Sequence, residues 1–510
     1  MNKQHISFAG FAAFTVLSAL SGCELKSEMY DAINPTIYPQ SERDARDLVT
    51  AAAYLPFRND EYDGIFNVAT GVSLTADMTS DYGFCSWDDG GTWTHLNFAA
   101  YTPADNRNAT KGWDGFLNSI SKMTLNIDRI SNLNINPDVK QQLIAELQCA
   151  RGFMAFLIYD LFGPLIIADL NTLKDPLTER ILPRLSDEDT RAFIVDNLTQ
   201  AADVLPHSYK RGDANYGRFT KGLCHMILLK FYMQTHQFEL AIQHGQELTK
   251  PDYGYALVTE KGSAPSAYAN IFTEANEQNA ETIWSAICKE GNLVHLWYPH
   301  VLPNNYGGFS GGWGGFKMTW DFFHTFELGD DRRETILYEY TDFTTGELLN
   351  EDNKGTSGNS FDQGVFPVKY AIEPNVGDHC QTDWIVYRYA DALTLLAEAL
   401  TRHTNTVSPE AIDLLNQVRT RASLPPYTST DFTSTADFLD KLLLERAHEL
   451  YFEGSRRQDL IRDGSYIDRL NAKCRAFGKP ELVSSKHLLF PLKESVINEG
   501  KGLVLQNPGY

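Results

Sequence analysis

Aromatic side chains gather in two glycine-rich stretches of this sequence, where they could bind a ligand that has flat apolar faces. Five of the eight tryptophans lie there: Trp87, Trp93, Trp297, Trp313 and Trp320. A glycine-rich loop displays rings more readily than it buries them by helix or strand packing. A sugar ring has an apolar face and a rim of hydroxyls, which suits an aromatic ring with Asp or Asn beside it.

This pattern selects the candidate ligand-binding residues. They are Trp87, Trp93, Trp313, Trp297, Tyr82, Asp81 and Tyr306. Trp320 is left out, because Asp321-Phe322-Phe323 follows it and favours the start of a helix. For any single ring two interpretations stay open: a ligand platform, or part of a small core beneath the loops. We expect at least one ring to be a platform.

Motifs of the common enzyme classes are missing from the sequence. It has no phosphate-binding GxxxxGK[ST] and no dinucleotide fingerprint. His448-Glu449 begins like a zinc protease motif, but Phe452 stands where the second histidine is needed. A pair of carboxylates for glycoside hydrolysis stays open, because such a pair needs only to be close in space. The sequence therefore favours a binding protein over an enzyme.

Acidic residues near the first aromatic stretch raise the question of a metal ion. Asp77 with Asp81, or Asp88-Asp89 before Gly90-Gly91, could bind calcium through oxygen. Polar turn residues are the alternative, and we prefer it. No metal site and no cofactor are expected, and a structural calcium ion stays open.

Six cysteines follow Cys23, and none of them lies in a CxxC pair. Disulfides are possible outside the cytoplasm, but the wide spacing identifies no partners. Cys149 and Cys224 fall in helical patterns, where a free cysteine usually behaves as a small buried hydrophobe. Mostly free thiols are expected.

The charge of the chain limits its partners. The 510 residues carry a formal net charge of −22. Nucleic acids and anionic lipids are polyanions, so an acidic surface of this size disfavours both as general partners. An acidic polysaccharide is disfavoured only weakly, since a local basic patch could bind it.

The first 22 residues have the layout of a secretory signal peptide. Lys3 supplies positive charge, and residues 8–20 form an apolar core too short to span a bilayer permanently. Leu20-Ser21-Gly22-Cys23 then resembles the lipobox of bacterial lipoproteins. In that class the Cys23 thiol would be acylated and would anchor the mature chain; an ordinary signal peptide is the alternative.

Helical periodicity dominates most of the remaining sequence, and it comes in pairs. Apolar residues recur at three- and four-residue steps over 143–161, and Gly163-Pro164 ends that helix. Ser408 and Ser434 are the expected N-caps of two later helices. The fold class is therefore mainly α: tetratricopeptide-like helix pairs over about 41–75, 112–250 and 385–475. A large loop-rich lobe with short strands is expected over about 76–111 and 251–384.

Several motifs along the chain resemble the RagB/SusD family. The segment ERAHELYFEGSRRQDLIR at 445–462 is similar to the family signature ER…EL.FEG.R..DLIR. Further matches are Ala150–Phe153, Gly329–Arg332, Arg388–Ala392 with Ala397–Ala399, Leu415–Ala422 and Gln506–Tyr510. The motif residues are interpreted as structural, with Arg446 and Glu449, or Glu453 and Arg457, pairing along one helix face.

The resemblance implies one SusD-like domain over residues 23–510 in an outer-membrane lipoprotein of a Bacteroidota-type bacterium. Such a protein faces the cell exterior, captures a glycan without catalysis and delivers it to a SusC-like TonB-dependent transporter. Two other functions stay open. A peptide-binding importer of the same fold would rely on backbone and Asn or Asp contacts. A surface glycosidase would need a carboxylate pair beside the aromatic rings.

Overall fold

The computed structural model describes residues 38–510, apart from 61–62, 106–110, 176, 178–179, 290–292, 308, 310, 373–376 and 378. The signal peptide and Cys23 lie outside the described residues, so their assignment stays a prediction. Within the described ranges the structure is mainly α, which confirms the expected fold class. None of the helices there is both long enough and apolar enough to cross a membrane.

The helices and strands have the following bounds. The helices are α1 (Glu42–Val49), α2 (Val72–Met78), α3 (Thr92–Asn97), α4 (Lys111–Ser131), α5 (Pro137–Phe162), α6 (Leu170–Lys174), α7 (Asp187–Ala202), α8 (Lys221–Gln234), α9 (Phe238–Leu248), α10 (Ala267–Asn270), α11 (Trp297–Val301), α12 (Trp320–Phe323), α13 (Tyr389–Thr404), α14 (Pro409–Arg421), α15 (Thr435–Leu450), α16 (Arg456–Asp463), α17 (Tyr466–Ala476) and α18 (Glu494–Glu499). The strands are β1 (Gly83–Cys85), β2 (Thr282–Ala286), β3 (Phe316–Met318), β4 (Ile336–Leu337), β5 (Tyr340–Thr341), β6 (Leu348–Leu349), β7 (Phe366–Pro367) and β8 (Trp384–Arg388).

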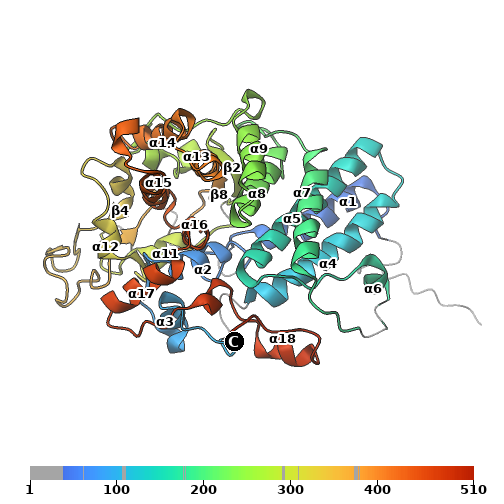
Figure 1. Ribbon diagram of the computed structural model, residues 1–510, viewed down its shortest axis with the longest axis horizontal. Coiled ribbons are helices and arrows are strands. Elements are labelled where there is room, and N and C mark those ends of the chain that lie inside the picture. Colours follow the sequence, from blue (N-terminus) through green and yellow to red (C-terminus); the bar gives the residue numbers. More distant parts are fainter. Residues whose placement is uncertain are drawn as a thin grey trace, which may run out of the picture.

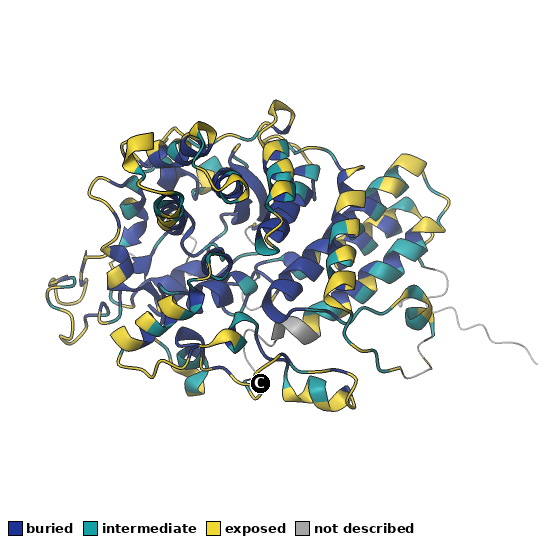
Figure 2. Ribbon diagram, viewed as in Figure 1, coloured by how far each residue is buried: buried dark blue, intermediate teal, exposed yellow. Residues whose placement is uncertain are grey.

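The long helices form one curved stack of neighbours. Helix α4 packs on α5, α5 on α7, α7 on α8, α8 on α9, α9 on α13, and α13 on α14 and α15 (Figure 1). Figure 2 shows that the helices bury the sides that face their neighbours and expose the opposite sides. A single helix pair could not bury its apolar face alone, so stacking supplies the core.

Capping residues set several helix ends where the sequence predicts them. Gly163 follows α5 with a φ of 74°, a conformation that favours glycine. The Ser408 side chain accepts a hydrogen bond from the Ala411 N–H, and Ser434 accepts one from the Asp437 N–H.

Short antiparallel strand pairs connect the loop-rich segments to this stack. The pairs are β1–β3, β2–β8, β4–β7 and β5–β6. In β1–β3, Gly83 pairs with Met318 and Cys85 with Phe316, which joins two segments more than 200 residues apart. This pair carries the candidate site described below.

Buried ion pairs hold the C-terminal helices to the loop-rich segments. Arg388, at the start of α13, contacts Glu281 (2.8 Å), Glu449 and Glu453, while Arg421 contacts Glu281 (2.9 Å) and Glu449. Arg332 contacts Glu445 at 2.6 Å and Glu449 at 3.4 Å. Glu449 therefore meets three arginines from three separate segments.

The predicted ion pairs along one helix face, Arg446 with Glu449 and Glu453 with Arg457, are wrong. Arg446 contacts Asp391 at 2.8 Å and Asp459 at 2.9 Å rather than Glu449. Arg457 donates to the carbonyls of His487 and Leu488 rather than to Glu453. Because these side chains point into the core, they contact other elements and not their neighbours on the same helix.

Buried histidines make the stability of the fold depend on pH. Burial lowers the pKa of His295 to about 3 and that of His300 to about 4. It lowers the pKa of His225, His244 and His487 to about 4 as well. These groups stay neutral in the folded chain near pH 5, whereas an unfolded chain would bind protons there.

We therefore expect the thermal unfolding midpoint to fall as the pH is lowered from 7 to 4. A depressed histidine pKa contributes stability above about pH 6.5, and this contribution is lost as the pH falls toward the folded-state pKa. Asp77 and Asp383, whose pKa values burial raises to about 7, offset part of this loss because their contribution declines as the pH rises. Calorimetry across this range checks the sign; an unchanged midpoint between pH 7 and 5 would contradict it.

All six cysteines in the described ranges are buried, and the structure gives no disulfide bond among them, in line with the expected thiols. The Cys149 and Cys224 sulfur atoms lie 3.5 Å apart between α5 and α8, a contact distance and not a bond.

Candidate functional site

Two tryptophans from distant segments meet at the surface and form an aromatic platform. The rings of Trp87 and Trp313 lie 6.2 Å apart between centroids, inclined by 59°. The Trp313 side chain is 45% exposed, and Trp87 is half-buried. We call Trp87 and Trp313 the platform from here on.

A layer of buried rings supports the platform from below. Trp93, His300 and Phe316 lie 6.0, 5.5 and 5.4 Å from the Trp87 ring. His300 also lies 5.0 Å from Trp313 and stacks on Phe316 at 4.9 Å. These close edge and stacked contacts restrict the directions in which the two platform rings can point.

Main-chain hydrogen bonds bring the two stretches together. The Ser86 N–H donates to the Gly315 carbonyl (2.9 Å), which extends the β1–β3 pair by one residue toward Trp87. The Trp313 N–H donates to the Pro299 carbonyl at 2.6 Å, and the Gly315 N–H to the His300 carbonyl at 2.9 Å. The Trp87 indole N–H donates to the Trp313 carbonyl at 3.3 Å, which ties one platform residue to the other.

The support of the platform carries no charge. His300 Nδ1 lies 2.6 Å from the Leu296 carbonyl, which can only accept, so Nδ1 bears the proton. Burial lowers the pKa of His300 to about 4, which keeps the imidazole neutral at physiological pH. At the edge, Asp88 and Asp89 are exposed, and Asp89 accepts from the Trp93 indole N–H at 3.1 Å. The site therefore combines exposed rings with a polar acidic edge.

Gly315 sets how closely Trp87 can approach the backbone. A Cβ atom at this position would lie 2.1 Å from the Trp87 ring. We expect Gly315→Ala to displace Trp87, weaken ligand binding and lower stability by about 1–3 kcal/mol. Gly307→Ala is the matched control, because its Cβ would meet only Phe343 at an ordinary 3.6 Å. Equal ligand affinity for the two variants, measured by calorimetry, would contradict this role.

Tyr82 and Trp297 are core residues, so their prediction as ligand-binding residues is wrong. Trp297 begins α11 and is fully buried against Tyr370, Trp384 and Phe452. Tyr82 is fully buried as well, and its hydroxyl donates to Asp77 at 2.7 Å. Rings near glycine-rich loops can still turn inward when distant segments supply the other side of a core.

Trp93 belongs to the platform, but as support. It is 5% exposed and lies beneath Trp87 and against Phe316. Its predicted role as a direct ligand contact is corrected to one of positioning, because the neighbouring rings cover its faces.

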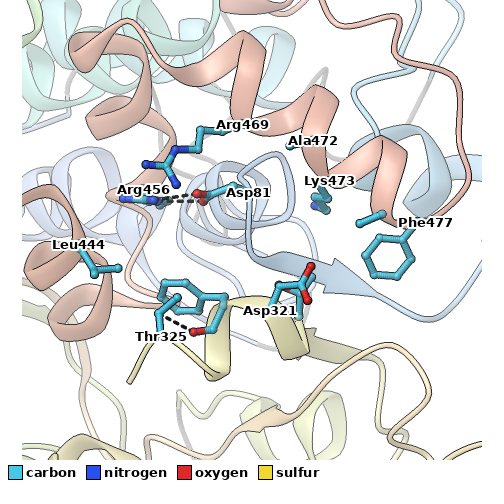
Figure 3. A pocket seen from close by; sticks show the side chains of 12 residues that line it. Asp81, Asp321, Thr325, Leu444, Arg456, Arg469, Ala472, Lys473 and Phe477 are labelled. Carbon is cyan, nitrogen blue, oxygen red and sulfur yellow. Dashed lines mark hydrogen bonds and ion pairs between the residues drawn. The ribbon is translucent and has the colours of Figure 1, made fainter. Parts of the chain in front are cut away.

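Asp81 lies in a separate pocket and not beside the tryptophans. This pocket has a volume of about 200 Å³ and lies between α12, α15 and α17 (Figure 3). Arg456 donates to both Asp81 oxygens, at 2.9 and 2.7 Å. Burial alone would raise the Asp81 pKa, but the Arg456 guanidinium outweighs it and lowers the pKa. Asp81 therefore stays ionised and paired.

Tyr306 is half-buried at a different part of the loop-rich region. Its ring meets the edge of Tyr340 at 5.7 Å, and its backbone pairs with Asp342. It has no ring contact with the platform in the part of the chain that the structure describes. Whether it contacts ligand stays a prediction.

The carboxylates suggested for calcium have other partners. Asp77 is buried and accepts from the Tyr82 hydroxyl and the Gly454 N–H (2.8 Å). Asp81 is paired with Arg456 as described above, so Asp77 and Asp81 do not form the suggested calcium site. Over the described ranges, no group of three or more His, Cys, Asp or Glu side chains is placed to hold a metal ion.

Sequence reasoning missed His300 and the arginine partners of Glu449. His300 follows Trp297-Tyr298-Pro299, and nothing in that spacing reveals that it faces Trp87 and Trp313. Arg332, Arg388 and Arg421 each lie in the motifs quoted above, but their shared partner becomes visible only in three dimensions.

Known proteins resemble this chain in sequence and in fold. Residues 280–510 match the model of the SusD family. The chain is 25% identical over 401 residues to SusD-like protein P38 of Formosa agariphila, covering 70% of this chain and 72% of that protein. It is 21% identical over 409 residues to SusD-like protein P2 of the same organism, covering 75% and 77%.

Solved structures share the fold over nearly the whole chain. A SusD homolog from Bacteroides thetaiotaomicron has a TM-score of 0.76 at 20% identity, covering 93% of this chain and 98% of that one. Surface glycan-binding protein A from the same organism, solved in complex with laminarihexaose, has a TM-score of 0.73 at 20% identity, covering 91% and 99%.

Proposed function

We propose that this chain is a cell-surface glycan-binding protein of the SusD family, whose model matches residues 280–510 and whose fold the chain shares. It captures an oligo- or polysaccharide and delivers it, chemically unchanged, to a SusC-like TonB-dependent transporter. The observation that carries the proposal is the platform, in which the exposed Trp313 indole and the half-buried Trp87 indole lie on a rigid support.

The platform suits a carbohydrate for physical reasons. Each indole offers a flat face to the C–H groups of a pyranose, and Asp88 and Asp89 at the edge can accept hydrogen bonds from hydroxyls. Because the planes of Trp87 and Trp313 are inclined by 59°, a flat ribbon-like chain cannot stack on both rings. A glycan that turns between successive units can, so the geometry favours a curved or helical polysaccharide.

Capture without catalysis is the second part of the proposal. A glycosidase needs a protonated general acid beside a second carboxylate at the bound sugar. Asp77 and Asp383 have pKa values raised to about 7 by burial, but both are buried and neither contacts Trp87 or Trp313. The carboxylates at the platform edge, Asp88 and Asp89, are exposed.

The cellular setting belongs to the same proposal. Acylation of Cys23 would anchor the chain in the outer membrane with its body facing the cell exterior. In that position the protein would hold ligand at the entrance of its transporter. The acidic charge of −22 is compatible with a neutral glycan as ligand.

A peptide is the second candidate ligand, and the Asp81 pocket favours it. Phe322, Leu444 and Phe477 give the lining of that pocket an apolar part, and charged side chains of both signs also line it (Figure 3). Arg469 and Asp321 form no ion pair with another residue in the described ranges. Charges of opposite sign beside apolar side chains match the termini and side chains of a short peptide.

Calorimetry on residues 24–510 tests the proposal. The ligands are neutral hexasaccharides (laminarihexaose, cellohexaose, maltohexaose and xylohexaose), acidic oligosaccharides and short peptides. We expect saturable heat with at least one saccharide and no new product by chromatography afterwards. Binding of peptides alone would transfer the function to the second candidate, and cleavage of a bound glycan would overturn capture without catalysis.

A further inference from the structure

A second groove, remote in sequence from the platform, lies beside the ends of α9 and β2. Its walls are the segments 208–211, 251–255 and 257–260, together with polar residues between 270 and 282. Its volume is about 650 Å³, within the usual range of ligand sites. We call it the tyrosine groove, after Tyr209, Tyr253 and Tyr255 in its lining.

Tyr209 is the residue in this groove that packing explains least. It is half-buried, but its ring contacts no other aromatic ring and its hydroxyl has no hydrogen-bond partner among the described residues. Tyr253 and Tyr255 in contrast stack on each other, with centroids 5.9 Å apart and planes inclined by 26°. One wall thus has a stacked pair, and the other has a ring free to stack on a ligand.

Hydrogen bonds fix the shape of the groove without using all its polar groups. The Arg211 guanidinium donates to the Ala275 carbonyl, and the Gly212 N–H donates to the Gln278 side chain, both at 2.8 Å. The Asn270 amide donates to the Glu260 carbonyl at 2.8 Å. These bonds join the walls to one another, so ligand binding would require little ordering of the loops.

The charges that line the groove balance. Lys210 and Arg211 are cationic, while Asp252 and Glu260 are anionic. The side chains of Lys210, Asp252 and Glu260 make no hydrogen bond or ion pair elsewhere in the described ranges, so all three can bind ligand hydroxyls. A lining with two charges of each sign favours a neutral, hydroxyl-rich ligand over a polyanion.

We propose that the tyrosine groove is a second glycan-binding site, which holds another stretch of the neutral polysaccharide bound at the platform. This inference rests on the proposed function. Tyr209 would stack on a sugar ring, while Lys210, Asp252 and Glu260 would bind hydroxyls at its edge. Two sites on one chain bind a long polysaccharide more tightly than either site alone, but give a short oligosaccharide no such gain.

The variant Tyr209→Ala distinguishes binding at the tyrosine groove from binding at the platform. We expect it to weaken binding of a soluble polymer such as laminarin by at least about tenfold and to leave the corresponding hexasaccharide on the platform within about twofold. Tyr209→Phe keeps the ring and is expected to bind as the wild type does. Tyr338→Ala is the control for loss of a surface tyrosine, since Tyr338 is 36% exposed and packs on Phe323 away from both sites.

The double variant Trp87→Ala/Trp313→Ala supplies the converse test, with the same hexasaccharides and their parent polymers. Its calorimetric titration should retain a weak saturable phase, which reports binding at the tyrosine groove. Adding Tyr209→Ala to the double variant should abolish this phase. Two results would overturn the inference. One is that the double variant gives no heat with any hexasaccharide that the wild type binds. The other is that the single variant Tyr209→Ala binds the polymers as the wild type does. If the wild type binds none of these glycans, the proposed function fails, and the proposed second site fails with it. If the wild type binds them but the variants give either of the two results above, only the second site fails.

Discussion

Glu449→Gln is expected to lower the free energy of unfolding by about 3–5 kcal/mol, because it leaves buried arginines without their shared counter-charge. Arg388, Arg421 and Arg332 all contact this carboxylate, and all four side chains are essentially inaccessible to solvent. Burial alone would raise the pKa of Glu449, but the Arg421, Arg388 and Arg332 guanidinium groups outweigh it and hold the pKa well below its usual range. The carboxylate is therefore ionised throughout the physiological pH range.

Urea and thermal unfolding of the variant measure this effect. Glu481→Gln is the matched control, because Glu481 forms an exposed ion pair with Arg475 and its loss should leave the midpoint unchanged. If Glu449→Gln unfolds at the wild-type midpoint, the network around Glu449 does not hold the C-terminal helices to the rest of the fold.

Removal of the platform is expected to have the largest effect on ligand affinity. Trp313→Ala and Trp87→Ala should each weaken glycan binding by about 1–3 kcal/mol, a size taken from the stacking of nucleic-acid bases on aromatic side chains. The two losses need not add, because the rings touch each other. Calorimetry with the hexasaccharide bound best by wild type measures them.

The two variants differ in what they do to the fold. Trp313 is 45% exposed, so its truncation removes little packing. Trp87 covers Phe316 and His300, so Trp87→Ala also opens a gap; Trp87→Phe, which keeps an aromatic ring there, separates packing from binding. Wild-type affinity in Trp313→Ala, with a normal unfolding midpoint, would remove that ring from the ligand site.

Local signals in the sequence were sufficient to predict the helices and several of their ends. Gly163, Ser408 and Ser434 act through hydrogen bonds to residues three or four positions away, so the sequence alone reveals their roles. The pattern of apolar residues likewise predicted the helix pairs, because the residues on the buried side of a helix recur every three or four positions along the chain.

The candidate site could be predicted only in part, because the direction of a ring depends on distant segments. Trp87, Trp93 and Trp313 do come together, as the shared composition of their loops indicated. Trp297 has the same kind of surroundings in sequence, yet Trp384 and Phe452 bury it. The partners of Glu449 and the walls of the tyrosine groove also come from segments far apart in the chain, which one sequence without its fold does not reveal.

A crystal structure of residues 24–510 with its bound oligosaccharide would show whether the platform holds the ligand. We expect a pyranose ring stacked on the Trp313 indole, with the next units turning toward Trp87 and the edge formed by Asp88 and Asp89. A glycan bound elsewhere with both tryptophans uncovered, or a peptide in the Asp81 pocket as the bound ligand, would contradict it.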